Sequence, residues 1–93
     1  MIKSFKCKKT QKLFDSRIAD QKFRSFAVQA LRKLAMLSYA DKLIDLRIPP
    51  ANKLEGLSGK RKGQYSIRIN QQYRICFVWK DGNAYDVEIV DYH

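Results

Sequence analysis

The sequence YSIRINQQYRICFVWKDGNAYDVEIV, residues 65–90, decides the fold. Apolar residues recur in it at every second position, as in β-strands that bury one face. The apolar positions of the first two strands are Tyr65, Ile67, Ile69, Tyr73, Ile75, Phe77 and Trp79. Asp81-Gly82 is a strong signal for a two-residue hairpin turn, after which the pattern continues. This stretch therefore predicts an antiparallel β-meander.

The loop between the first two strands determines which residues face each other. A three-residue loop, Asn70-Gln71-Gln72, sets Arg68 opposite Arg74 and groups the large apolar residues on the other face. A two-residue loop would set Arg68 against Ile75 and bury a charge on an apolar face, which is costly. We therefore predict the first register, with two guanidinium groups side by side and no carboxylate nearby. Such a pair suits an anion that binds between them, although two solvated surface arginines remain an alternative.

The last strand brings the end of the chain toward these arginines. If Asp81-Gly82 is a two-residue turn, Ile89, Asp91 and His93 fall on the Arg74 face. Tyr92 then points the opposite way unless the chain bends.

Helical periodicity precedes the strands, between about residues 10 and 39. A short first helix is followed by Asp20, a plausible N-cap for a second, amphipathic one. Its apolar stripe is Phe23, Phe26, Ala27, Ala30, Leu31, Leu34 and Leu37. Residues 2–7 suit an edge strand, and residues 41–46 suit a further helical turn before Pro49-Pro50. We predict an α+β fold: an N-terminal strand, two to three helices, and one antiparallel sheet with the helices on one face.

The composition is that of one small domain, residues 1–93, with 45% hydrophobic residues. Cys7 and Cys76 form no disulfide framework, and one histidine with two isolated cysteines gives no zinc spacing. No cofactor is indicated. The sequence shows neither a signal peptide nor an apolar run long enough to span a membrane. A cytoplasmic, reducing environment is therefore expected, with no membrane partner.

The charge indicates an anionic partner. The formal net charge is +10, with +8 in residues 1–33 and +5 in residues 58–79. The second region contains the loop Lys60-Arg61-Lys62. Nucleic acid is the first expectation, and an acidic protein is the second. Each basic patch taken alone is also compatible with an ordinary solvated surface.

Two ordered stretches carry a family resemblance. They are LSGKRKGQYSIRINQQYRICF, residues 57–77, and DVEIVDYH, residues 86–93, and Ile48-Pro49-Pro50 and Leu54 also fit. Together they resemble the HigB-type toxins of the RelE superfamily over most of the chain. Ser58 departs from the pattern, because many members have lysine there, and Tyr65 and Tyr73 replace frequent tryptophans.

The resemblance implies a RelE-like fold and a toxin of a type II toxin–antitoxin system. Such a toxin is a ribosome-dependent mRNA endonuclease that enters the ribosomal A site and halts translation. Its expected partner is a HigA-type helix-turn-helix antitoxin, and the complex of the two would bind operator DNA.

Metal-independent RNA cleavage by the ribose 2′-hydroxyl assigns roles to the candidate residues. The reaction needs stabilisation of the phosphorane charge, which Arg68 and Arg74 suit, and proton transfer. His93 has the only side chain whose ordinary pKa lies near neutrality, so it is the natural acid or base. Tyr92 suits base stacking or a hydrogen bond, and Asp91 suits orienting the imidazole or acting as a weak base. Lys60, Arg61 and Lys62 suit contacts with RNA phosphates.

Two other functions remain open at this point. A non-catalytic RNA-binding module would also be basic and rich in aromatic residues. A structural or interaction protein with an acidic partner would explain the basic helices but not the paired arginines.

Overall fold

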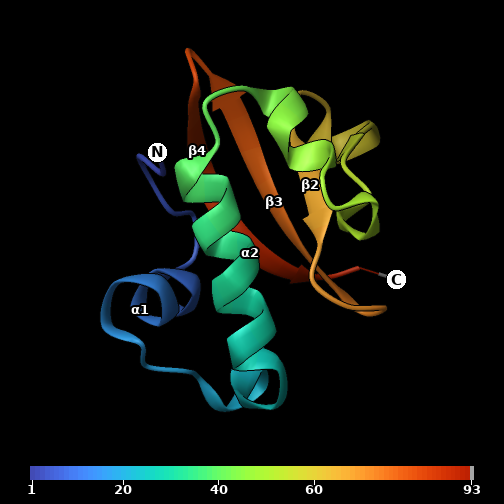
Figure 1. Ribbon diagram of the computed structural model, residues 1–93. Coiled ribbons are helices and arrows are strands. Elements are labelled where there is room, and N and C mark those ends of the chain that lie inside the picture. Colours follow the sequence, from blue (N-terminus) through green and yellow to red (C-terminus); the bar gives the residue numbers. More distant parts are fainter. Residues whose placement is uncertain (93) are drawn as a thin grey trace.

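The computed structural model describes residues 1–92. Two α-helices, α1 (Lys8–Ser16) and α2 (Ala27–Tyr39), precede a four-stranded antiparallel sheet in the order β1-β2-β3-β4. The strands are β1 (Glu55–Gly56), β2 (Tyr65–Arg68), β3 (Tyr73–Lys80) and β4 (Asn83–Asp91). Short 3₁₀ turns connect these elements: η1 (Gln21–Phe26), η2 (Leu43–Arg47), η3 (Pro50–Asn52) and η4 (Gly59–Arg61). Figure 1 shows α2 crossing one face of the sheet, and the predicted α+β arrangement is confirmed.

The predicted hairpin registers are also confirmed. Arg68 lies opposite Arg74 in the β2–β3 pair, and the Ile69 amide donates to the Tyr73 carbonyl across the three-residue loop at 2.9 Å. Lys80 lies opposite Asn83, so Asp81-Gly82 is a two-residue turn. Both turn residues have positive φ, 52° and 76°, as a hairpin turn of this type requires.

The core lies between α2 and the sheet. It contains the predicted helical stripe and the apolar rows of three strands. Its buried members include Leu13, Phe23, Phe26, Ala30, Leu34, Leu37, Ile67, Ile75, Phe77, Val87 and Ile89. Asp20 is an N-cap as predicted, but it caps η1, where its carboxylate accepts a hydrogen bond from the Lys22 amide at 3.0 Å. This hydrogen bond lowers the pKa of Asp20. No helix within residues 1–92 has the length and apolar character needed to cross a membrane.

The predicted N-terminal strand forms only two isolated parallel bridges with β4, Ile2 to Ala84 and Phe5 to Val87. The reason is an irregularity in β4 between these bridges. Cys76 lies opposite Glu88 and Val78 opposite Tyr85, so Phe77 alone faces both Asp86 and Val87. Asp86 is the extra residue of this β-bulge, with φ of 52°. A parallel ladder cannot continue regularly past it.

The bulge reverses the two faces of β4 beyond residue 86. Since side chains alternate, one extra residue moves every later side chain to the opposite face. Ile89 lies opposite Ile75 in the core, and Val90 lies opposite Arg74. The prediction that Ile89 and Asp91 share the Arg74 face was therefore wrong. The same prediction for His93 concerns a residue outside those described.

Candidate functional site

The sheet face turned away from α2 carries both predicted arginines. Arg68 and Arg74 are directly opposite in the β2–β3 ladder, so their side chains leave the same face. Ser66 on β2, together with Cys76 on β3, shares that face by alternation. We call this surface, including Glu88 and Val90 of β4, the arginine face.

Arg74 is held on three sides. Its Nε donates to Ser66 Oγ at 2.9 Å, and its Nη2 donates to the Lys53 carbonyl at 2.6 Å. Its Nη1 lies 3.3 Å from Glu55 Oε1, and the Arg74 side chain is only 12% exposed. The expectation that no carboxylate lies near the arginines was wrong, because β1 brings Glu55 beside them. These contacts fix the guanidinium plane, which is what recognition of a phosphate requires.

Arg68 differs from Arg74 in its surroundings. It is half-buried, and its guanidinium makes no hydrogen bond or ion pair with any residue between 1 and 92. Its positive charge is therefore available to an anion that approaches the arginine face. Arg74 is therefore held in a fixed orientation, and Arg68 is free to pair with an anion.

Tyr92 packs against Arg74 on the arginine face. Its ring centroid lies 5.4 Å from Cζ of Arg74, and its amide donates to the Gln72 carbonyl at 2.7 Å. A guanidinium at this distance from an aromatic ring is stabilised by a cation–π contact. The β4 bulge explains the position, because it places Tyr92 on the arginine face in place of Asp91.

Asp91 lies on the helix side of the sheet and not on the arginine face. It is opposite Tyr73 in the ladder, and the Tyr73 ring stacks on Phe26 on the helix side. Its carboxylate accepts a hydrogen bond from Gln72 Nε2 at 3.0 Å. The structure therefore does not place Asp91 between the arginines. His93, predicted as the acid or base, lies outside the described residues.

In the predicted basic loop, Arg61 forms an ion pair with β4, whereas Lys60 and Lys62 extend into solvent. Arg61 Nη1 lies 2.8 Å from Glu88 Oε1 and 3.1 Å from Gln64 Oε1. The hydrogen bond to Glu88 raises the pKa of Arg61. Lys60 and Lys62 are exposed, and within residues 1–92 their ammonium groups have no such partner. Arg61 thus ties the loop to β4, and the two lysines present charge to solvent.

Cys76 also lies on the arginine face, and its side chain is fully buried. Burial raises the pKa of its thiol. Cys7 and Cys76 are both free thiols. Within residues 1–92, no three side chains of His, Cys, Asp or Glu are grouped so that they could hold a metal ion.

Sequence reasoning missed Glu55, Ser66 and Glu88. Ser66 was recognisable, because it alternates with Arg68 on a strand whose face was known. Glu88 becomes recognisable only once the bulge is included. Glu55 sits on a strand of two residues, which is too short to show any periodicity.

The sequence matches the model of a family described as the RelE-like toxin of the type II toxin–antitoxin system HigB, over residues 3–93. Toxin HigB-1 of Vibrio cholerae is 55% identical over 53 residues, and these cover 57% of this chain and 56% of that toxin. The chain thus spans about half the length of that relative, and likewise 52% of an uncharacterized Haemophilus influenzae protein that is 50% identical. Endoribonuclease HigB of Proteus vulgaris is 31% identical over the whole of both chains.

Solved structures show the same fold at low sequence identity. In the YoeB–YefM toxin–antitoxin complex from Staphylococcus aureus, the matched chain has a TM-score of 0.58 and 19% identity, with 100% of this chain and 98% of that chain covered. YafQ from Escherichia coli has a TM-score of 0.52 and 14% identity, and the match covers 98% of this chain and 93% of YafQ. These likenesses support the architecture in Figure 1.

Proposed function

Because the chain belongs to the HigB-like family of RelE-like toxins in type II toxin–antitoxin systems, we propose that it is an endoribonuclease that cuts mRNA on translating ribosomes. The observation that supports this most directly is the pair of opposed arginines, with Arg74 fixed by three contacts and Arg68 without a described partner. The full-length relative named an endoribonuclease supports the same activity.

The proposed reaction needs no metal. The ribose 2′-oxygen attacks phosphorus, the bond from phosphorus to the 5′-oxygen breaks, and a 2′,3′-cyclic phosphate forms. The 2′-hydroxyl gives up its proton and the departing 5′-oxygen takes one. Arg68 and Arg74 stabilise the extra negative charge of the pentacoordinate phosphorane.

The remaining residues receive supporting roles in this proposal. His93 transfers a proton, as the family resemblance implies. Tyr92 stacks on a base beside the scissile phosphate and keeps Arg74 in plane. Lys60 and Lys62 contact RNA phosphates, and Arg61 holds their loop against Glu88. Asp91 holds the β2–β3 loop through Gln72, and its proposed role is to orient the His93 imidazole or to act as a weak base.

The proposed partners follow from the family and the charge. The chain would bind the ribosomal A site and its mRNA, and a HigA-type helix-turn-helix antitoxin would neutralise it. The two proteins together would bind operator DNA. This activity belongs in the bacterial cytoplasm, where translation takes place.

Primer-extension mapping of mRNA 5′ ends in translating cells tests the activity. Wild-type protein should produce cuts confined to translated frames, and Arg68→Ala and His93→Ala should abolish them. Lys80→Ala, an exposed position at the hairpin turn, is the matched control. RNA binding without cuts by the wild-type protein would establish the non-catalytic RNA-binding module instead. Naked RNA is a misleading substrate, because the ribosome supplies part of the proposed site.

A further inference from the structure

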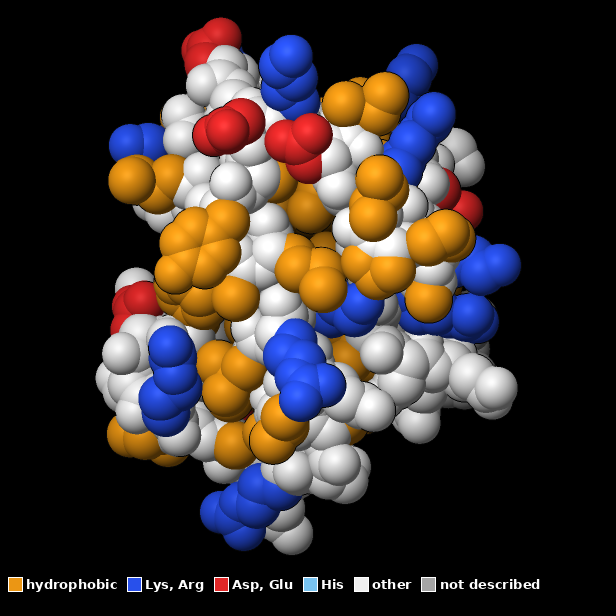
Figure 2. All heavy atoms as spheres, viewed as in Figure 1, with side chains coloured by type: hydrophobic (Ala, Val, Ile, Leu, Met, Phe, Trp, Pro, Cys, Tyr) orange, Lys and Arg blue, Asp and Glu red, His pale blue; other side chains and the backbone are white. Residues whose placement is uncertain are grey.

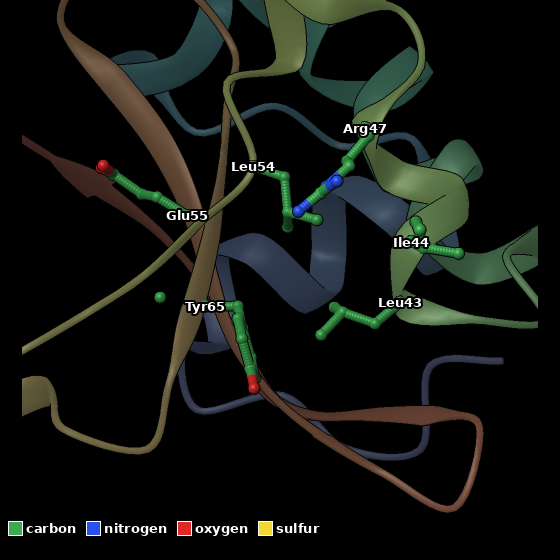
Figure 3. A pocket seen from close by; sticks show the side chains of 7 residues that line it. Leu43, Ile44, Arg47, Leu54, Glu55 and Tyr65 are labelled. Carbon is green, nitrogen blue, oxygen red and sulfur yellow. The ribbon is translucent and has the colours of Figure 1, made fainter.

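A groove lies on the helix side of the sheet edge, away from the arginine face. It has a volume of about 320 Å³ and lies between η2 and the strands β1 and β2. Figure 3 shows its lining, which consists of Leu43, Ile44, Arg47, Leu54, Glu55, Gly56 and Tyr65. Most of these contribute aliphatic or aromatic carbon.

The wall formed by η2 is fixed in place. Asp45 Oδ2 accepts hydrogen bonds from the amides of Asp41 and Lys42, at 3.2 and 3.0 Å, and so orders the start of the turn. Leu46 is buried, and its carbonyl accepts from Nδ2 of the buried Asn52 at 3.1 Å. The turn therefore cannot fold its outer side chains inward.

Apolar side chains remain exposed on this fixed wall. Ile44 is 58% exposed, and Ile48, which follows the turn, is 77% exposed. Figure 2 shows hydrophobic side chains gathered over this part of the molecule. An exposed apolar surface on a turn that hydrogen bonds hold in place is typical of a surface that binds a partner.

The groove has a net positive character, because its one cation is unpaired within residues 1–92 and its one carboxylate is engaged elsewhere. Arg47 lines it, and its guanidinium makes no hydrogen bond or ion pair with any described residue. Figure 3 shows the Arg47 side chain reaching toward Leu54, and the Glu55 carboxylate pointing away. Glu55 is engaged with Arg74 on the opposite face. The groove thus offers an unpaired cation among aliphatic side chains, which complements a carboxylate next to an apolar residue.

We propose that this groove binds a short acidic segment of the antitoxin. An apolar side chain of that segment packs against Leu43, Ile44 and Leu54, and its carboxylate pairs with Arg47. This rests on the proposed function, which supplies the antitoxin. Peptide is favoured over RNA because the wall is mainly aliphatic and offers one cation, whereas RNA-binding surfaces combine stacking platforms with rows of basic residues.

Two charge changes in the groove and two matched controls test the proposal. Arg47→Glu and Ile44→Asp alter the groove, and Arg32→Glu and Val28→Asp alter exposed positions on α2 outside it. Calorimetric titration of each full-length variant uses the purified HigA-type antitoxin of the proposed function as the probe. The groove variants should bind it at least about tenfold more weakly, and the controls within about twofold of wild type. Thermal melts verify that all four remain folded.

The same variants separate this proposal from the endoribonuclease activity. Primer-extension mapping should show wild-type mRNA cuts from Arg47→Glu and Ile44→Asp, and suppression of these cuts should require at least about tenfold more antitoxin than for the wild-type protein. Wild-type antitoxin affinity in both groove variants would overturn the docking site, as would loss of mRNA cutting with antitoxin binding intact. Absence of cuts from the wild-type protein would instead overturn the endonuclease proposal, and the titrations would still decide the groove. A wild-type protein that binds no antitoxin also overturns the docking site.

Discussion

The guanidinium carbon of Arg74 lies 5.4 Å from the centre of the Tyr92 ring, and this contact depends on a single extra residue in β4. Without the Asp86 bulge, Ile89 and Asp91 would face the arginines and Tyr92 would face the helices. The composition of the arginine face is thus set by a backbone irregularity in β4, two residues before Glu88.

Arg74→Lys should lower the rate of mRNA cutting by about 10²–10³-fold, the usual cost of losing one preorganised donor to a transition-state oxyanion. An ammonium group cannot contact Ser66 Oγ, the Lys53 carbonyl and Glu55 in one plane as the guanidinium does. The measurement is the single-turnover rate on programmed ribosomes. Arg32→Lys on α2 is the control for a change of cation alone, and wild-type cutting by Arg74→Lys would argue against a planar phosphate clamp.

Tyr92→Phe and Tyr92→Ala separate the ring from its hydroxyl. If stacking and the cation–π contact are the main contributions, Phe should cut within about threefold of wild type. Ala should lose roughly 5- to 150-fold, because base stacking on an aromatic ring contributes about 1–3 kcal/mol. Cutting rates on programmed ribosomes decide between these outcomes. Equal losses in both variants would show that the hydroxyl group, and not the ring, carries the function.

The bulge itself can be tested through stability. Asp86 has φ of 52°, where a β-branched residue is strained, so Asp86→Val should lower the free energy of unfolding by about 1–2 kcal/mol. Asp86→Gly should stay within about 1 kcal/mol of wild type, because glycine adopts this conformation freely. Deleting residue 86 should abolish folding, since it would turn Ile89 out of the core. Urea denaturation measures the free energy of unfolding of all three variants. A folded deletion variant would contradict the assigned register.

Local rules were enough to predict the arginine pair and the helical stripe. The Arg68–Arg74 register depends only on a three-residue loop and on keeping charge off an apolar face, and both are visible within a few residues. The buried stripe of α2 follows in the same way from its period. These features need no knowledge of distant parts of the chain.

The bulge and the Glu55 contact could not be predicted in this way. The sequence around Asp86 reads as continuous alternation, and only the fit of Val87 and Ile89 into a core shared with α2 requires the extra residue. Glu55 reaches Arg74 through pairing of β1 with β2, which depends on the path of the whole segment between α2 and β2. Both are consequences of tertiary packing.

The buried thiol of Cys76 predicts a loss of stability at alkaline pH. Burial raises its pKa in the folded protein, so above about pH 8.5 the unfolded chain releases this proton first. The folded state then binds more protons, and the free energy of unfolding falls as pH rises through this range. Urea denaturation between pH 7 and 10 should show a steeper fall in wild type than in Cys76→Ala. Identical slopes would mean that Cys76 ionises as easily folded as unfolded.

In the loop Lys60-Arg61-Lys62, the two lysines should affect binding to ribosomes, and Arg61 should affect the stability of the fold. Lys60→Ala and Lys62→Ala should each reduce the salt dependence of binding to programmed ribosomes by about one unit of slope and leave stability within about 0.5 kcal/mol. Arg61→Ala should lower the free energy of unfolding by about 1–3 kcal/mol, because it leaves the Glu88 carboxylate, only 16% exposed, without its cation. Filter binding from 50 to 200 mM salt, with urea denaturation alongside, measures both effects. A stability loss in the lysine variants, or none in Arg61→Ala, would contradict the roles assigned from the Arg61–Glu88 contact.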